Sequence, residues 1–112
     1  MIGALLALLA VVAIQPPPAS LPDAVLYGDA RAVQSLIAGG AGVDEFDATG
    51  MTPLMIAASE GRTAIARILI AAGADVKLAG ADGTTALMRA ASANRLETMQ
   101  LLIASGAEVN AK

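Results

Sequence analysis

A 33-residue period runs through most of this chain and limits the folds that are open to it. When the sequence is shifted by 33 positions, residues 47–79 align without a gap on residues 80–112. Fifteen residues of the first window find an identical counterpart in the second: Ala48, Gly50, Thr52, Leu54, Met55, Ala57, Ala58, Ser59, Arg62, Leu69, Ile70, Ala71, Gly73, Ala74 and Val76. A fixed period of this length indicates a stack of similar units, each burying an apolar flank against its neighbours.

A third, abbreviated copy precedes these two, from Ser20 to about Phe46. It keeps small and apolar positions of the full repeats: Leu21, Ala24, Gly28, Leu36, Ile37, Gly40, Ala41 and Val43. The sequence therefore predicts one repeat domain over residues 20–112, with units at about 20–46, 47–79 and 80–112.

Each full unit carries the start and stop signals of a first helix. Thr52 is a favourable N-cap residue, Pro53 suits the first helical position, and Gly61 can end the helix in the left-handed conformation. Thr85 can start the equivalent helix in the last unit without a proline.

A second helix is predicted in each full unit, at about residues 63–71 and 96–104, with glycine beyond each end. Helical spacing turns one set of apolar residues toward the stack: Ile65, Ile68, Leu69 and Ala72 in one unit, and Met99, Leu102 and Ile103 in the next. We interpret Arg62 and Arg67 as part of a solvated outer helix face. Residues 73–85, rich in Gly and Asp, predict a projecting hairpin-like turn.

The units resemble the ankyrin repeat, and the resemblance covers the chain from about Ser20 to Lys112. It rests on Thr-Pro-Leu at 52–54, Ala-Ala at 57–58, Gly at 61 and Gly-Ala-Asp-Val at 73–76. The chain departs from the family pattern where the usual His after Thr-Pro-Leu is replaced by Met55 and, in the next unit, by Met88. The resemblance implies an all-α solenoid of stacked helix–turn–helix units with short β-hairpin-like turns.

The resemblance also implies a non-catalytic module that binds a partner protein through hairpin tips and the concave face of the first helices. Carried over position by position, that surface comprises Leu26, Tyr27, Phe46, Thr49, Met51, Glu60, Asp82, Thr84, Arg89 and Ala93. The same alignment places Ile56, Ser59 and Ser92 on the first-helix face. Tyr27 and Phe46 are the two aromatic residues of the chain, and aromatic residues contribute strongly to interfaces. Packing at the end of the stack for Tyr27, or under the first turn for Phe46, is an equally good interpretation.

Composition limits the chemistry of such a surface. The formal net charge is −3, and the seven basic residues are scattered, so we do not expect nucleic acid as a partner. The sequence has no His and no Cys, and therefore lacks the commonest general base, thiol nucleophile and thiolate ligand. Asp44, Glu45 and Asp47 lack the spacing of a calcium loop, and we interpret them as a solvated turn. We expect no enzymatic activity, cofactor or metal.

Residues 1–19 follow a different pattern. An unbroken apolar run spans residues 2–14, and prolines at 16–18 then stop any helix. A helix of that length reaches roughly 20 Å, short of the roughly 30 Å hydrocarbon core, so we expect a signal peptide and no stable membrane span. Cleavage after Ala13 and cleavage after Ala19 both fit, and the product would be periplasmic or secreted. An uncleaved membrane anchor and a buried capping helix are the alternatives.

Two classes of function are compatible with this sequence. The first is an independent module that binds a protein partner. The alternative is a structural fragment or protomer whose C-terminal repeat stacks on further repeats or self-associates, through a flank that includes Leu101 or Met99. This alternative follows because arrays of this kind need about three units and polar outer faces to be soluble alone.

Overall fold

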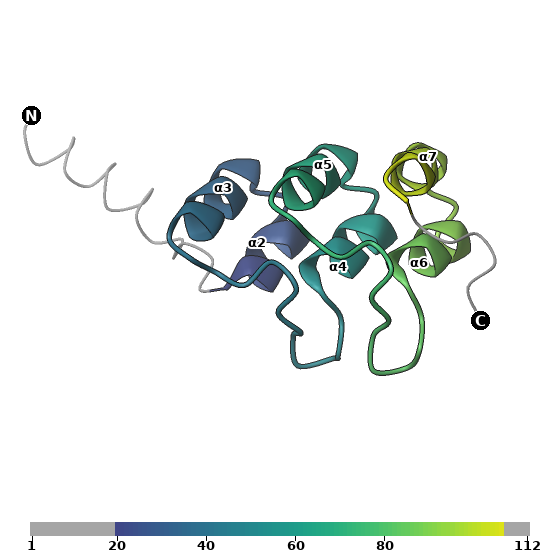
Figure 1. The fold of residues 1–112 in the computed structure, drawn as a ribbon, viewed down its shortest axis with the longest axis horizontal. Helices are drawn as coiled ribbons and strands as arrows, with labels where there is room; N and C mark the ends of the chain where they lie inside the picture. Colours follow the sequence, from purple (N-terminus) through teal and green to yellow (C-terminus); the bar gives the residue numbers. More distant parts are fainter. Residues whose placement is uncertain (1–19, 107–112) are drawn as a thin grey trace, which may run out of the picture.

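The computed structural model describes residues 20–106, which form six helices in two layers (Figure 1). The first helices of the three units are α2 (Leu21–Tyr27), α4 (Pro53–Glu60) and α6 (Ala86–Ser92). The second helices are α3 (Ala30–Ala38), α5 (Thr63–Ala71) and α7 (Leu96–Ala104). Each first helix packs on the second helix of its own unit, and equivalent helices of neighbouring units pack on each other. The expected all-α stack of helix pairs is confirmed.

The predicted boundaries of the helices are confirmed. The sequence could predict them because each cap depends on residues within one turn of the helix end. The Thr52 side chain accepts a hydrogen bond from the Met55 N–H over 3.3 Å, and Thr85 accepts one from Met88 over 3.3 Å. Gly61 ends α4 in the left-handed conformation with φ 69°. The second helices occupy residues 63–71 and 96–104, as their spacing predicts.

Met55 occupies the position at which the family pattern has His. Its Sδ accepts a hydrogen bond from the Thr52 N–H at 3.5 Å, which completes a reciprocal cap at the start of α4. A thioether is a weak acceptor, so this bond adds little to the cap. The side chain is 1% exposed, and its sulfur lies close to Gly80 of the second hairpin.

The core lies between the two layers and between neighbouring units. Leu54, Leu69 and Leu102 are at most 1% exposed. Alanines fill many of the other core positions, which brings the helices close together; the fully buried alanines are Ala24, Ala57, Ala58, Ala66 and Ala90. Burying a leucine side chain contributes about 2 kcal/mol, so each of these three leucines adds substantially to the stability.

Two of the inward positions predicted for the second helices are wrong. Ala72 is the exposed C-cap residue of α5, because the helix ends at Ala71 and the residue after it does not face the stack. Ile103 is 44% exposed, whereas its counterpart Ile70 is half-buried. Helix α5 packs between α3 and α7, but within residues 20–106 no further unit follows α7.

Two hairpin loops project beyond the layer formed by α2, α4 and α6 (Figure 1). The first is closed by a hydrogen bond from the Asp47 N–H to the Met51 carbonyl over 2.8 Å. The second is closed by a 2.8 Å bond from Gly80 to Thr84, beside an antiparallel bridge between Ala79 and Thr85. The predicted hairpin-like turn within residues 73–85 is therefore present.

None of the helices within residues 20–106 has both the length and the apolar character that a membrane span requires. The predicted signal peptide, residues 1–19, lies outside the part of the chain that the structure describes. Export from the cytoplasm therefore stays a prediction.

Candidate partner-binding groove

A groove follows the first helices where they face the hairpin tips, and two adjoining pockets that share Ser59 define it. We name each pocket by the helices that it lies between. The α2–α4 pocket has a volume of about 240 Å³ and is lined by Pro22, Asp23, Leu26, Asp47, Thr49, Met51, Ile56, Ser59 and Glu60. The α4–α6 pocket has a volume of about 510 Å³ and is lined by Ser59, Asp82, Thr84, Met88, Arg89, Ser92 and Ala93.

The 33-residue period builds the same pocket twice. Six positions of the α2–α4 pocket recur one period later in the α4–α6 pocket, pairing Leu26 with Ser59, Thr49 with Asp82, Met51 with Thr84, Ile56 with Arg89, Ser59 with Ser92 and Glu60 with Ala93. The backbone geometry is thus repeated while the chemistry changes from one pocket to the next.

Eight of the ten residues that the resemblance assigns to partner binding line these two pockets. Leu26, Thr49, Met51 and Glu60 line the α2–α4 pocket, and Asp82, Thr84, Arg89 and Ala93 line the α4–α6 pocket. The other two, Tyr27 and Phe46, lie outside both pockets and are 70% and 48% exposed.

Five pocket residues differ from what the sequence indicated: Ile56, which it placed on the first-helix face, and Pro22, Asp23, Asp47 and Met88, which it did not place at the groove. Ile56 is only 5% exposed, so it forms a floor to the α2–α4 pocket and is not an exposed contact residue. Pro22 and Asp23 belong to the abbreviated leading unit, where the alignment named Leu26 and Tyr27 alone. The period did contain the signal for Asp23, because it aligns with Ile56 and Arg89.

The α2–α4 pocket combines an apolar surface with acidic side chains. Leu26 is 48% exposed and Met51 is half-buried, while Asp23 and Glu60 are exposed carboxylates that line the same pocket. Within residues 20–106 no hydrogen bond or ion pair engages either of these two carboxylates. None of the described residues that line this pocket is basic.

Asp47 holds the tip of the first hairpin in place. One of its carboxylate oxygens accepts hydrogen bonds from the Thr49 N–H at 2.8 Å, the Thr49 hydroxyl at 2.6 Å and the Met51 N–H at 3.0 Å. Desolvation by burial raises the pKa of Asp47, but the hydrogen bonds from Thr49, Met51 and Gly50 together outweigh it and lower the pKa. Asp47 is therefore an anion at neutral pH and adds a third negative charge to the α2–α4 pocket.

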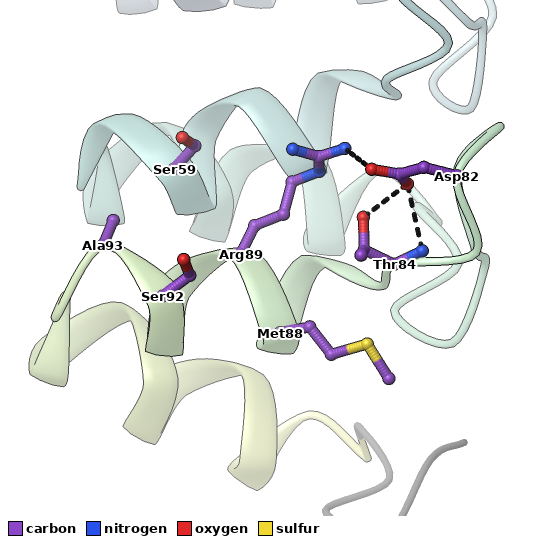
Figure 2. A pocket seen from close by; sticks show the side chains of 7 residues that line it. All are labelled: Ser59, Asp82, Thr84, Met88, Arg89, Ser92 and Ala93. Atoms are coloured by element: carbon purple, nitrogen blue, oxygen red, sulfur yellow. Dashed lines mark hydrogen bonds and ion pairs between the residues drawn. The ribbon is translucent and has the colours of Figure 1, made fainter.

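The α4–α6 pocket contains an ion pair between the second hairpin and α6 (Figure 2). One oxygen of Asp82 accepts hydrogen bonds from the hydroxyl and the N–H of Thr84, at 2.7 and 3.1 Å. The other oxygen accepts a bond from Nη2 of Arg89 at 3.0 Å. The hydrogen bonds from Thr84, and then the charge of Arg89, lower the pKa of Asp82. The charges of this pocket thus neutralise each other.

The two hairpins place the stabilising carboxylate at different positions because they lie against each other. The Ala81 N–H donates to the Gly50 carbonyl over 3.1 Å, and Gly80 occupies the position equivalent to Asp47. A Cβ added at Gly80 would lie 2.8 Å from the Gly50 oxygen, so an aspartate does not fit there. Asp82 bonds to Thr84 in the second hairpin as Asp47 bonds to Thr49 in the first.

The acidic turn before the first hairpin has a structural role. The carboxylate of Asp44 accepts hydrogen bonds from the Asp75 N–H, at 3.1 and 3.3 Å, and so joins the loops of two neighbouring units. In the part of the chain that the structure describes, no group of three acidic side chains is arranged to hold a metal ion.

The family model described as "Ankyrin repeats (3 copies)" matches residues 21–112. The chain therefore belongs to the ankyrin-repeat family, as the resemblance in the sequence indicated. Ankyrin repeats are generally protein–protein interaction modules and are typically non-enzymatic. A search of curated proteins finds no match to this chain.

Proposed function

We propose that this protein binds a partner protein non-catalytically, along the groove formed by the α2–α4 and α4–α6 pockets. The observation that carries the proposal is the repetition of six pocket positions with an interval of 33 residues. Two equivalent pockets side by side can accept successive side chains of one partner segment. The exposed rings of Tyr27 and Phe46, outside the pockets, offer further apolar contact area to a larger partner.

Site-specific crosslinking tests this proposal without knowledge of the partner. A photoreactive amino acid is introduced at Glu60 or Thr84 in the groove and, as a matched control, at Arg67 or Gln100, which are exposed on the second helices. We expect one protein partner to be crosslinked from both groove positions and from neither control position. Crosslinking of that partner from the second helices instead would refute the groove as the binding surface.

A structural protomer is the second candidate, and one comparison favours it. Ala58 on α4 is fully buried, whereas its counterpart Ala91 on α6 is exposed. Helix α6 covers α4, but within residues 20–106 no further first helix covers α6. This flank of the last unit would be covered by a further repeat or by a second copy of the chain.

We also propose that the protein acts outside the cytoplasm, in the periplasm or as a secreted product. The apolar run of residues 2–14 and the prolines that follow support this location, since a run of this length suits a signal peptide better than a membrane span. An uncleaved anchor would hold the groove close to a membrane surface instead.

A further inference from the structure

We infer that the α2–α4 pocket takes a lysine or arginine side chain of the partner protein. The aliphatic part of that side chain would lie on Leu26 and Met51 above Ile56, and its charged end would meet the carboxylates of Asp23, Asp47 and Glu60. The inference rests on the proposed function, because it names the chemistry of the partner that the groove binds.

The comparison of the two pockets carries the first step. At the equivalent positions, the α2–α4 pocket has Leu26, Met51 and Ile56 where the α4–α6 pocket has the polar residues Ser59, Thr84 and Arg89. The α2–α4 pocket is therefore the apolar one of the pair. Its volume of about 240 Å³ is below the range of about 300–1,000 Å³ that is usual for small-molecule sites, and suits a single long side chain.

The second step concerns the charges. Among the described residues, the carboxylates of the α2–α4 pocket have no basic side chain beside them in the pocket, whereas the α4–α6 pocket contains Arg89. Arg89 neutralises Asp82 in the α4–α6 pocket over 3.0 Å. The residue one period before Arg89 is Ile56, and the residue two periods before it is Asp23; both line the α2–α4 pocket. Arg62, which reaches α2 from α5, donates its hydrogen bond to the Leu26 carbonyl. A cation supplied by the partner is the complement of this pocket.

Lysine and arginine fit this combination better than other side chains do. Both have a long aliphatic stem that can cover apolar surface while the charged end stays in a polar, hydrated position. A purely apolar side chain would cover Leu26 and Met51 but would leave three anions close to it without compensation. An acidic side chain would be repelled by the same three anions.

Selection of peptides from a random dodecamer library against the full chain tests the inference. We expect the enriched peptides to carry Lys or Arg at one dominant position. The affinity of the leading peptide is then measured by fluorescence anisotropy. Replacing that peptide residue by Met, which keeps the length and removes the charge, should weaken binding, and the affinity of the unchanged peptide should fall as salt is added.

Matched variants of the protein identify the pocket. Glu60→Ala replaces Glu60 by alanine, as at the equivalent position Ala93 of the α4–α6 pocket. Asp23→Asn removes a second negative charge. Both side chains are exposed, so neither substitution should change the fold. Each substitution should weaken binding by about two- to fivefold. Glu97→Gln, an exposed acid on α7 outside both pockets, should leave the affinity unchanged. Glu60→Lys should bind better when the basic peptide residue is exchanged for Glu.

The outcomes separate this inference from the proposed function. If the enriched peptides are neutral or acidic and Met51→Ala weakens their binding, the inferred basic side chain of the partner is refuted. The groove then still stands as the binding surface. Peptides that bind equally well to wild type, Met51→Ala and Glu60→Ala would refute both. A library that yields no enriched peptide would contradict the inference, since the α2–α4 pocket would then hold no short basic segment. A dominant basic peptide residue whose contribution to binding is reduced by Glu60→Ala supports the inference.

Discussion

Arg62 donates a hydrogen bond from Nη2 to the carbonyl oxygen of Leu26 over 3.2 Å and so joins the start of α5 to the end of α2 in the preceding unit. One period later, Nε of Arg95 donates to the carbonyl of Ser59 over 3.1 Å. A cation near a helix C-terminus is favourable, because it meets the partial negative charge of the last carbonyls. The leading unit has Asp29 at this position, where it caps its own helix.

The glycines at the ends of α2 and α4 make room for these arginines. A Cβ added at Gly28 would lie 2.7 Å from Cζ of Arg62, and one added at Gly61 would lie 2.9 Å from Cδ of Arg95. Asn94 takes the equivalent place after α6 with φ 58°. Glycine therefore serves two purposes at these positions, since it adopts the left-handed conformation and admits the side chain of the next unit.

Arg62→Ala should destabilise the stack by about 1 kcal/mol, because the Leu26 carbonyl loses a donor and the two units lose a link. The urea midpoint of unfolding measures the effect. Arg67→Ala is the matched control, since Arg67 is exposed on the same helix. Equal midpoints for the two variants would mean that the hydrogen bond to Leu26 contributes nothing to stability.

The sequence could predict the helix ends, which depend on local residues, but not the contact of Arg62 with Leu26 in the preceding unit. Helix ends at Thr52, Gly61 and Thr85 were predictable because capping depends on residues within one turn. The sequence indicates a solvated face for Arg62 and does not reveal its hydrogen bond, because the acceptor lies 36 residues earlier in the chain. The period did hold a signal, since Arg62 and Arg95 are identical counterparts.

For the pockets as well, part of the arrangement could be predicted from the sequence and part could not. The resemblance predicted most of the positions that line the two pockets, because equivalent positions of a repeat have equivalent environments. It did not predict that Ile56 is almost completely buried while Tyr27 and Phe46 lie outside the pockets. Burial depends on how closely neighbouring units pack, and a pattern within one unit contains no measure of that distance.

Leu69→Ala should destabilise the protein by about 2 to 5 kcal/mol, because Leu69 is fully buried on α5, which packs against α3, α4 and α7. A stack with a total stability of about 5 kcal/mol would then be largely unfolded. Circular dichroism during thermal unfolding measures the change. Ile103→Ala, at a 44% exposed position, should have a much smaller effect. A melting temperature within a degree or two of wild type for Leu69→Ala would contradict this account of the core.

Thr49→Val should raise the pKa of Asp47 toward its ordinary value of 3.8, because the variant removes the hydroxyl that donates over 2.6 Å. The folded-state pKa of Asp47 is lowered, so its hydrogen bonds stabilise the fold above pH 3.8 and this contribution is lost as the pH falls through the folded-state value. Carboxylate titration by NMR measures the pKa. Thr84→Val should act on Asp82 and leave Asp47 unchanged. An unchanged Asp47 titration in Thr49→Val would show that the backbone donors alone lower the pKa.

Leu8→Arg should retain the chain in the cytoplasm if residues 2–14 act as a signal peptide. A charge at the centre of an apolar helix costs about 3 kcal/mol on transfer into the membrane. Cell fractionation and intact mass of the product measure export and cleavage, and Leu8→Val keeps the run apolar as a control. Equal export of wild type and Leu8→Arg would exclude this segment as the export signal.

The exposed flank of α6 predicts self-association of the full chain at micromolar concentration. Ala58 is fully buried where α6 packs on α4, and Ala91 is the equivalent surface of α6. A charge at this surface should prevent stacking, so Ala91→Glu should reduce association in sedimentation velocity.

Met99→Glu is a less selective test, because Met99 is half-buried against the core and its substitution should also lower the melting temperature. Ala64→Glu, exposed on α5, should associate like wild type. A wild-type chain that stays monomeric over this range, with an Ala91→Glu variant that behaves identically, would show that the flank of α6 does not bind a second copy.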